Sequence, residues 1–143
     1  MVPKDKNYFK KLLSSLNNKK SEITIVGLGY VGLPLALSFC EAGYKVIGID
    51  IDEEKTKKIN SGFSYINHIS NKRIIKSIEN NKLFATTDFS KTTNSEGIIL
   101  CVPTPLGKNR EPNLTFIKKK FRINDCKIIV NFKIYKNRLT NPI

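Results

Sequence analysis

The sequence has few of the residues from which catalytic and metal-binding sites are commonly built. It contains one histidine, three cysteines and no tryptophan. Cys40, Cys101 and Cys126 are odd in number and have neither the spacing of a metal site nor that of a disulfide framework. We therefore expect no metal site and a reducing, cytoplasmic location, with Cys40 and Cys101 as small core residues. The single histidine, His68, falls in a predicted loop, where a structural hydrogen-bonding role is more common than a catalytic one.

The chain also lacks long hydrophobic runs. None approaches the roughly 20 apolar residues that a helix needs to cross a bilayer. The pair Leu12-Leu13 is followed at once by two serines, which excludes the uninterrupted apolar core of a secretory signal. We therefore expect no membrane partner.

Acidic residues are scarce, with 12 against 25 lysines and arginines, so the formal net charge is +13. The excess lies in the two flanks: residues 1–20 carry +5 and residues 118–143 carry +7, whereas residues 21–117 carry only +1. Terminal lysine runs are usually solvated. We therefore expect no nucleic-acid partner. A basic adaptor that binds nucleic acid or a membrane surface through its flanks is the less favoured alternative.

The sequence does contain a strand–turn–helix–strand pattern over residues 23–50. A β-branched apolar run at residues 23–26 predicts a buried strand. The glycine pattern GLGYVG follows at residues 27–32, and an apolar helical segment comes after it. A second apolar strand, residues 45–49, leads directly into Asp50. A G-x-G-x-x-G pattern in this context predicts a dinucleotide-binding crossover rather than an ordinary tight turn.

Each glycine of this turn has a predicted role. Gly27 allows a sharp turn off the strand, Gly29 allows backbone N–H groups to approach a pyrophosphate, and Gly32 allows the helix to lie close to the strand. The first helical turn has N–H groups without intrahelical partners, and the helix dipole adds about half a positive charge there. A diphosphate fits this position. The whole turn, Tyr30 and Val31 included, is therefore assigned to the cofactor site.

Asp50 comes 18 residues after Gly32, close to the roughly 20 expected of the acid that holds an adenosine ribose. A carboxylate there accepts hydrogen bonds from ribose hydroxyls and repels the 2′-phosphate of NADP. The next four residues include no arginine to neutralise that phosphate, so we expect NAD as the cofactor. Because Asp50 should face the ligand, its replacement by alanine should leave the free protein's stability nearly unchanged. Lys55 points either toward the ribose or into solvent, and both interpretations stay open.

The rest of the chain alternates between helical and strand patterns. Helices are expected over residues 5–17, 53–60 and 70–81, and strands over residues 83–87 and 97–102. The last strand is apolar without alternation, as in a parallel strand covered on both faces. The predicted fold is therefore α/β: a Rossmann-type doubly wound parallel sheet, incomplete, with a short N-terminal helix.

Pro103 and Thr104 follow the last predicted strand directly. Ligands of open parallel sheets bind beyond the carboxyl ends of the strands. We therefore assign both residues to the ribose–nicotinamide half of the cofactor site. The alternative is that the Pro-Thr-Pro sequence merely ends the strand.

Four sequence blocks resemble the N-terminal part of the UDP-glucose/GDP-mannose dehydrogenase family, the nucleotide-sugar 6-dehydrogenases. They are VGLGYVGLPLA at residues 26–36, VIGIDID at 46–52, SYINHI at 64–69 and CVPTPL at 101–106. Within this family the chain is most similar to the UDP-N-acetyl-glucosamine 6-dehydrogenases, with coverage from about Tyr8 to Ile117. The resemblance implies that four residues contact NAD: Val31, Asp50, Lys55 and Thr104.

The resemblance also implies what complete family members do. They oxidise the C6 alcohol of a UDP-sugar to a carboxylate with two NAD, through a thioester on an active-site cysteine, for polysaccharide synthesis. They homo-oligomerise, which a chain of this length need not do. Their catalytic residues do not occur here, and Cys126 lacks the glycine-rich context of their nucleophile. We therefore assign no catalytic residue and expect this chain to be inactive by itself, with a non-catalytic NAD-binding remnant as the alternative.

Composition divides the chain into three parts. Residues 1–20 are expected to form a helix and a basic linker, and residues 21–117 a partial NAD-binding domain. Of the 26 residues from Lys118 onward, 18 are Lys, Ile, Asn, Phe or Tyr, the bias that an AT-rich reading frame gives when read out of phase. We therefore predict that residues 118–143 are an atypical basic tail, frameshifted or disordered. A strand-like run at residues 126–130 comes too early for the family pattern.

Overall fold

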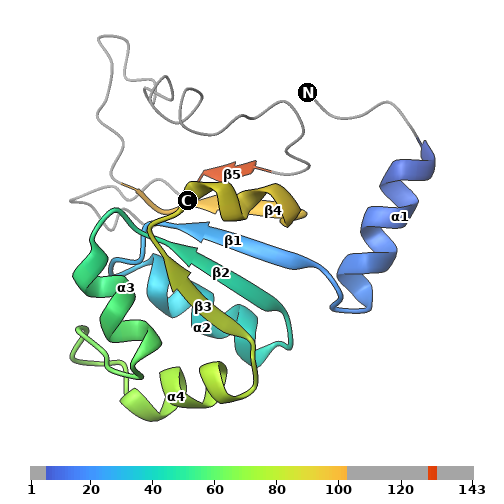
Figure 1. Ribbon diagram of the computed structural model, residues 1–143. Helices are drawn as coiled ribbons and strands as arrows, with labels where there is room; N and C mark the ends of the chain where they lie inside the picture. Colours follow the sequence, from blue (N-terminus) through green and yellow to red (C-terminus); the bar gives the residue numbers. More distant parts are fainter. Residues whose placement is uncertain (1–5, 103–128, 132–143) are drawn as a thin grey trace, which may run out of the picture.

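The computed structural model describes residues 6–102 and 129–131 of the chain. These residues contain a five-stranded parallel sheet with the strand order β3-β2-β1-β4-β5. The strands are β1 (Glu22–Val26), β2 (Lys45–Ile49), β3 (Leu83–Thr86), β4 (Gly97–Leu100) and β5 (Ile129–Asn131). The first strand, β1, lies in the middle of the sheet. The chain then moves outward through β2 and β3 and crosses to the other side of β1, where β4 and β5 lie (Figure 1). This reversal confirms the predicted Rossmann-type sheet.

The bounds of the helices follow the predicted ranges closely, with one early end. They are α1 (Lys6–Asn17), α2 (Gly32–Glu41), α3 (Glu53–Asn60), α4 (Asn71–Glu79) and the short 3-10 helix η1 (Phe89–Asn94). Asp52 caps α3, because its carboxylate accepts hydrogen bonds from the N–H groups of Glu54 and Lys55. Ser70 precedes α4 as predicted, but its side chain makes no capping hydrogen bond. α4 ends earlier than predicted, because Asn81 adopts the left-handed conformation with φ of +53°.

Two hydrophobic clusters cover the two faces of the sheet, because successive strand residues point to opposite faces. The larger cluster includes Ile23 and Ile25 of β1, Leu33 and Leu37 of α2, Ile59 of α3 and Ile74 of α4. The smaller cluster includes Val26, Ile49 and Leu100, with Phe89 of η1 packed against it. α2, α3 and α4 therefore cover one face, while the crossover from β3 to β4 passes over the other.

α1 lies beside the start of β1, apart from the other helices (Figure 1). Its last turn attaches it to the sheet. Leu16 packs against the larger cluster, and its carbonyl accepts a hydrogen bond of 3.0 Å from the Tyr44 hydroxyl. Ser15 donates a hydrogen bond of 2.8 Å to Glu96, the residue before β4. The predicted N-terminal helix is thus held by contacts with the residue before β2 and the residue before β4.

β5 lies inside the segment that we predicted to be a tail. It pairs in parallel with β4, so that Ile98 lies opposite Ile129 and Leu100 lies opposite Asn131. Residues 129–131 therefore form a short strand, and the frameshifted or disordered tail over residues 118–143 stays a prediction. These residues overlap the apolar run at 126–130, which comes too early for the family's pattern. Their backbone groups pair with the outer side of β4. The remainder of residues 118–143 lies outside the described residues.

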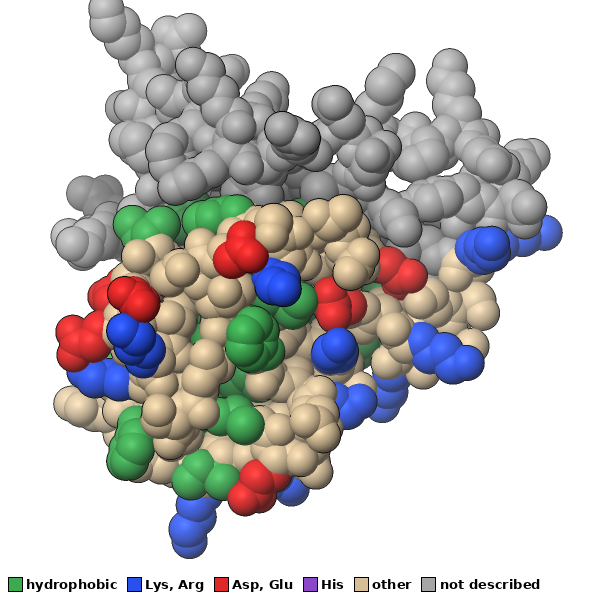
Figure 2. Space-filling view, viewed as in Figure 1, with side chains coloured by type: hydrophobic (Ala, Val, Ile, Leu, Met, Phe, Trp, Pro, Cys, Tyr) green, Lys and Arg blue, Asp and Glu red, His purple; other side chains and the backbone are tan. Residues whose placement is uncertain are grey.

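The described surface carries both signs of charge. On the face seen in Figure 2, acidic and basic side chains are interspersed, with a few hydrophobic side chains between them. No helix of residues 6–102 is long and apolar enough to cross a membrane. In the same part of the chain, no group of three or more histidine, cysteine, aspartate or glutamate side chains is placed to hold a metal ion.

Candidate functional site

The turn between β1 and α2 is shaped by close backbone contacts. Gly27 has φ of +90°, and a Cβ atom there would lie 2.7 Å from the carbonyl oxygen of Cys101. A Cβ atom on Gly32 would lie 1.6 Å from the carbonyl oxygen of Gly27. Gly27 thus permits a left-handed backbone beside the end of β4, and Gly32 lets the start of α2 approach the turn. The predicted close approach at Gly32 is therefore mainly to the turn itself.

Gly29 differs from the other two glycines because the space beside it is open. Apart from Gly29 and its chain neighbours, no heavy atom of the described residues lies within 4 Å of a Cβ atom built on Gly29. Among the hydrogen bonds of the described residues, none is donated by the N–H groups of Gly29, Tyr30 or Val31. These donors precede the first turn of α2, where the helix dipole also favours an anion. Open space, and donors without a partner in the described part of the chain, together fit one phosphate-bearing ligand.

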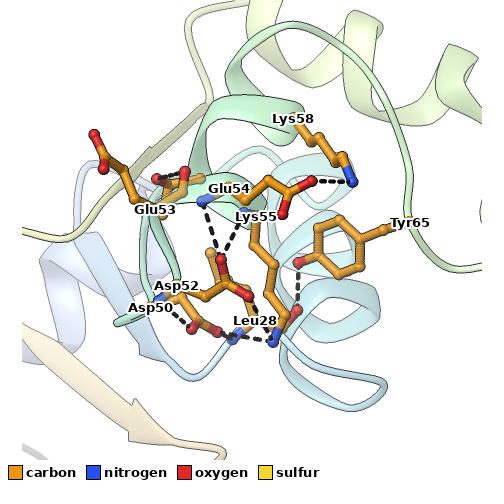
Figure 3. A network of polar contacts seen from close by, with 9 residues as sticks. Leu28, Asp50, Asp52, Glu53, Glu54, Lys55, Lys58 and Tyr65 are labelled. Carbon is orange, nitrogen blue, oxygen red and sulfur yellow. Dashed lines mark hydrogen bonds and ion pairs between the residues drawn. The ribbon is translucent and has the colours of Figure 1, made fainter.

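Asp50 follows β2, and only 8% of its surface is exposed. One carboxylate oxygen accepts a hydrogen bond of 2.8 Å from the Leu28 N–H, and the other accepts one of 3.0 Å from the Asp52 N–H (Figure 3). The carboxylate therefore joins the glycine turn to the start of α3. This corrects the expectation that replacing Asp50 leaves the free protein unaffected. Each carboxylate oxygen has two lone pairs, so acceptor capacity for ribose hydroxyls remains.

Lys55, in the first turn of α3, extends back toward the same carboxylate. Its Nζ atom lies 3.9 Å from Oδ2 of Asp50 and 4.0 Å from Oδ2 of Asp52. The same atom lies 5.9 Å from the centre of the Tyr65 ring. Lys55 thus lies beside the Asp50 carboxylate, and its assignment to the cofactor site stays a prediction.

Two residues of the loop between α3 and α4, Tyr65 and His68, contact the turn. The Tyr65 hydroxyl donates a hydrogen bond to the carbonyl oxygen of Leu28, as Figure 3 shows. Tyr30 is 73% exposed and stacks on His68, with ring centres 6.4 Å apart. His68 thus contacts the turn through its ring. The sequence had assigned no role to Tyr65, although its SYINHI block was one of the four that carried the resemblance.

The two described cysteines are small core residues, as predicted. Cys40 and Cys101 are 6% and 5% exposed. Burial raises the pKa of the Cys40 thiol to about 11, and it also raises the pKa of the Cys101 thiol. Both thiols are therefore neutral near pH 7, and a neutral thiol is a poor nucleophile.

The predicted site residues meet at one edge of the sheet. The turn at residues 27–32, Asp50 and Lys55 lie together at the carboxyl ends of β1 and β2. β4 ends beside β1, with Leu100 opposite Val26, so the reversal of strand order falls between them. Pro103 and Thr104 lie outside the described residues, and their assignment to the site stays a prediction.

Comparison with known proteins identifies the family. The NAD binding domain of the UDP-glucose/GDP-mannose dehydrogenase family matches residues 21–131. The chain belongs to this family. The matched residues, 21–131, correspond to the family's NAD-binding domain. The match also includes β5 and therefore extends beyond the predicted domain boundary at residue 117.

Individual relatives agree with this assignment. The UDP-N-acetyl-D-mannosamine dehydrogenase of Pyrococcus horikoshii is 39% identical over 101 residues, which are 70% of this chain and 24% of that protein. The enzyme of the same name from Campylobacter jejuni is 33% identical over 102 residues, 71% of this chain and 25% of that protein.

Solved structures give the same result. A GDP-mannose dehydrogenase from Pseudomonas aeruginosa has a TM-score of 0.58 and 35% identity, covering 68% of this chain and 23% of that one. The UDP-D-ManNAc dehydrogenase from P. horikoshii has a TM-score of 0.58 and 38% identity, covering 71% and 24%. The chain thus spans about a quarter of the length of these relatives.

Proposed function

We propose that this chain binds NAD at the turn of residues 27–32 and at Asp50. It would serve as the cofactor-binding part of an NAD-dependent dehydrogenase that oxidises the C6 alcohol of a UDP-sugar, a UDP-N-acetyl-hexosamine, to a uronate. The observation that carries the proposal is the open space at Gly29 beside N–H donors that have no partner among the described residues. The family membership supports the cofactor, and the named relatives support the substrate class.

Each part of the site has a distinct task in this proposal. The N–H groups of Gly29, Tyr30 and Val31 hold the diphosphate, because they have no other partner among the described residues. Asp50 accepts hydrogen bonds from the adenosine ribose with its remaining lone pairs, and Lys55 offsets part of its charge. Pro103 and Thr104 border the nicotinamide half. NAD, when bound, accepts the hydride that leaves the substrate alcohol.

Thermal melts with and without NAD test cofactor binding directly. NAD at about 100 times its dissociation constant should stabilise the full chain by about 2.7 kcal/mol, which appears as a higher melting temperature. NADP at the same concentration should give a smaller rise, because its 2′-phosphate meets the Asp50 carboxylate. An unchanged melting temperature with both nucleotides would reject the proposed site.

Replacing Gly29 with alanine tests the diphosphate cradle. The free variant should melt close to the wild type, since a Cβ atom there meets no neighbour within 4 Å. The NAD-induced rise should shrink or vanish, because the methyl group would occupy the space that the diphosphate needs. A variant that keeps the full rise would contradict a ligand at Gly29.

An NADH-formation assay with UDP-N-acetylglucosamine or UDP-N-acetylmannosamine separates an enzyme from a non-catalytic remnant. We expect no turnover by this chain alone, because the resemblance assigns the catalytic residues to sequence beyond the matched part. NADH formation above a control without UDP-sugar would contradict this expectation.

A further inference from the structure

The peptide groups on either side of Leu28 are held by two side chains from different elements. Asp50, after β2, accepts a hydrogen bond of 2.8 Å from the Leu28 N–H. Tyr65, in the loop between α3 and α4, donates its hydroxyl hydrogen to the Leu28 carbonyl oxygen. Figure 3 shows the two side chains reaching Leu28 from different directions. A residue of the glycine turn is thereby fixed by contacts 22 and 37 residues away in sequence.

The contact with the Leu28 carbonyl also determines where the Gly29 N–H points. The two groups belong to the same peptide unit, and no cis peptide bond occurs in the described residues. In a planar trans peptide the C=O and N–H bonds point in opposite directions. A hydroxyl that holds the Leu28 carbonyl on one side therefore directs the Gly29 N–H to the other. Gly29 is the residue with open space beside it.

Tyr65 is itself well fixed for this task. Two neighbours in its loop, Ile66 and Ile69, are 2% and 3% exposed in the larger cluster. Burial, followed by the nearby charges of Asp50 and Asp52, raises the pKa of the Tyr65 hydroxyl. The hydroxyl therefore stays protonated at every physiological pH and remains a hydrogen-bond donor.

We propose that Tyr65 is a positioning residue of the NAD site, whose hydroxyl holds the Leu28 carbonyl and so presents the Gly29 N–H to the diphosphate. This inference rests on the proposed function. Tyr65 needs no contact with NAD, since it acts through the Leu28–Gly29 peptide. It gives the SYINHI block a role in cofactor binding.

Tyr65→Phe removes the hydroxyl and keeps the ring, including its contact with Lys55. The chain offers a matched control: Tyr44 also donates its hydroxyl hydrogen to a backbone carbonyl, that of Leu16, at 3.0 Å and away from the site. Tyr44→Phe thus accounts for the loss of one tyrosine hydrogen bond in general. Both variants and the wild type are titrated as full chains with NAD, ADP and adenosine. All titrations are made at a temperature at which melts show the wild type and both variants to be folded.

The expected result is selective for the diphosphate. Tyr65→Phe should weaken NAD and ADP binding about three- to tenfold, the range for one neutral hydrogen bond, and leave adenosine binding unchanged. Tyr44→Phe should leave all three affinities at wild-type values. In ¹H–¹⁵N spectra of the free proteins, the Gly29 amide signal should move in Tyr65→Phe and stay in place in Tyr44→Phe.

The outcomes separate this inference from the proposed function. If the wild type binds NAD and Tyr65→Phe binds it equally well, the positioning role is wrong while the function stands. An equal loss for adenosine and ADP, or an unmoved Gly29 signal, would likewise overturn the positioning role. If the wild type binds neither NAD nor ADP, the proposed function falls and this inference falls with it.

Discussion

Asp50 and Gly32 belong to the proposed ligand site, and both residues also stabilise the protein when no ligand is bound. Asp50 joins the glycine turn to α3 through two backbone hydrogen bonds. Gly32 lets α2 begin where any side chain would collide with the Gly27 carbonyl. Both residues are therefore needed before a cofactor arrives, and each gives a prediction that can be tested without NAD.

Asp50→Ala should lower the free energy of unfolding of the free protein by about 1–3 kcal/mol, because it leaves two backbone N–H groups without their acceptor. Asp50→Asn keeps one acceptor oxygen, so its free energy of unfolding should fall by less than that of Asp50→Ala. Urea denaturation without NAD measures both variants against the wild type. Equal stability of Asp50→Ala and wild type would mean that the carboxylate does not hold the turn.

Gly32→Ala should destabilise the protein far more than Gly29→Ala. A Cβ atom at residue 32 would lie 1.6 Å from a backbone oxygen, which no side-chain rotation relieves. Crowding of this kind costs about 1–3 kcal/mol or more. Melts of the two variants side by side measure the difference. Similar melting temperatures would show that the turn and α2 separate easily.

At the element scale, α2 and α4 are joined by an ion pair on their exposed sides. Glu41, the last residue of α2, accepts hydrogen bonds of 2.7 and 3.1 Å from the Arg73 guanidinium on α4. The hydrogen bonds from Arg73, together with its charge, lower the pKa of Glu41. Roughly half of the Glu41 side chain is exposed, so solvent screens the pair and limits its contribution.

Glu41→Gln should cost at most about 1 kcal/mol of unfolding free energy at pH 7. Because the pKa of Glu41 is lower in the folded protein, the pair stabilises above the ordinary glutamate pKa of 4.5. That contribution is lost as the pH falls through the lower, folded value. Urea denaturation at pH 7 and over a series of falling pH values should thus show a difference that shrinks in acid and disappears once Glu41 is protonated in the folded protein.

A matched control for this pair lies within α3. Glu53 pairs with Lys57 at 3.0 Å, but both residues belong to the same helix. Glu53→Gln should therefore cost less than Glu41→Gln at pH 7, about 0.3–0.5 kcal/mol. The reverse order would contradict a larger contribution from the pair between α2 and α4.

At the scale of the whole molecule, β5 changes which strand forms an edge of the sheet. β4 pairs with β1 on one side and with β5 on the other. Without β5, the N–H and C=O groups along the outer side of β4 would have no partner strand. Unpaired edges of this kind promote association between chains.

A chain ended after residue 117 should therefore aggregate more than one ended after residue 131. The longer chain retains β5 and all of the sequence that matches the family. Static light scattering and size-exclusion chromatography at matched concentrations measure the difference. Equal solubility of the two chains would show that β5 does not protect β4.

Most elements could be predicted from the sequence because their signals are local. The cap at Asp52 lies within three residues of the N–H groups that it accepts from, and the predicted range of α3 agrees with the structure. A β-branched apolar run predicted the buried strand β1, and an uninterrupted apolar run predicted a parallel strand covered on both faces, as found for β4. The order of glycines, strands and acid predicted the crossover, because a dinucleotide site of this kind is built from one continuous segment.

The sequence by itself thus determined the class of fold, the glycine turn and the acid that follows β2. Only the tertiary structure decided that Asp50 and Tyr65 meet at Leu28, and that the early apolar run pairs with β4. The physical reason is that periodicity and capping are properties of neighbouring residues. Contacts between residues 22 or more positions apart depend on how the crossovers pack, and no local pattern encodes which atoms they bring together.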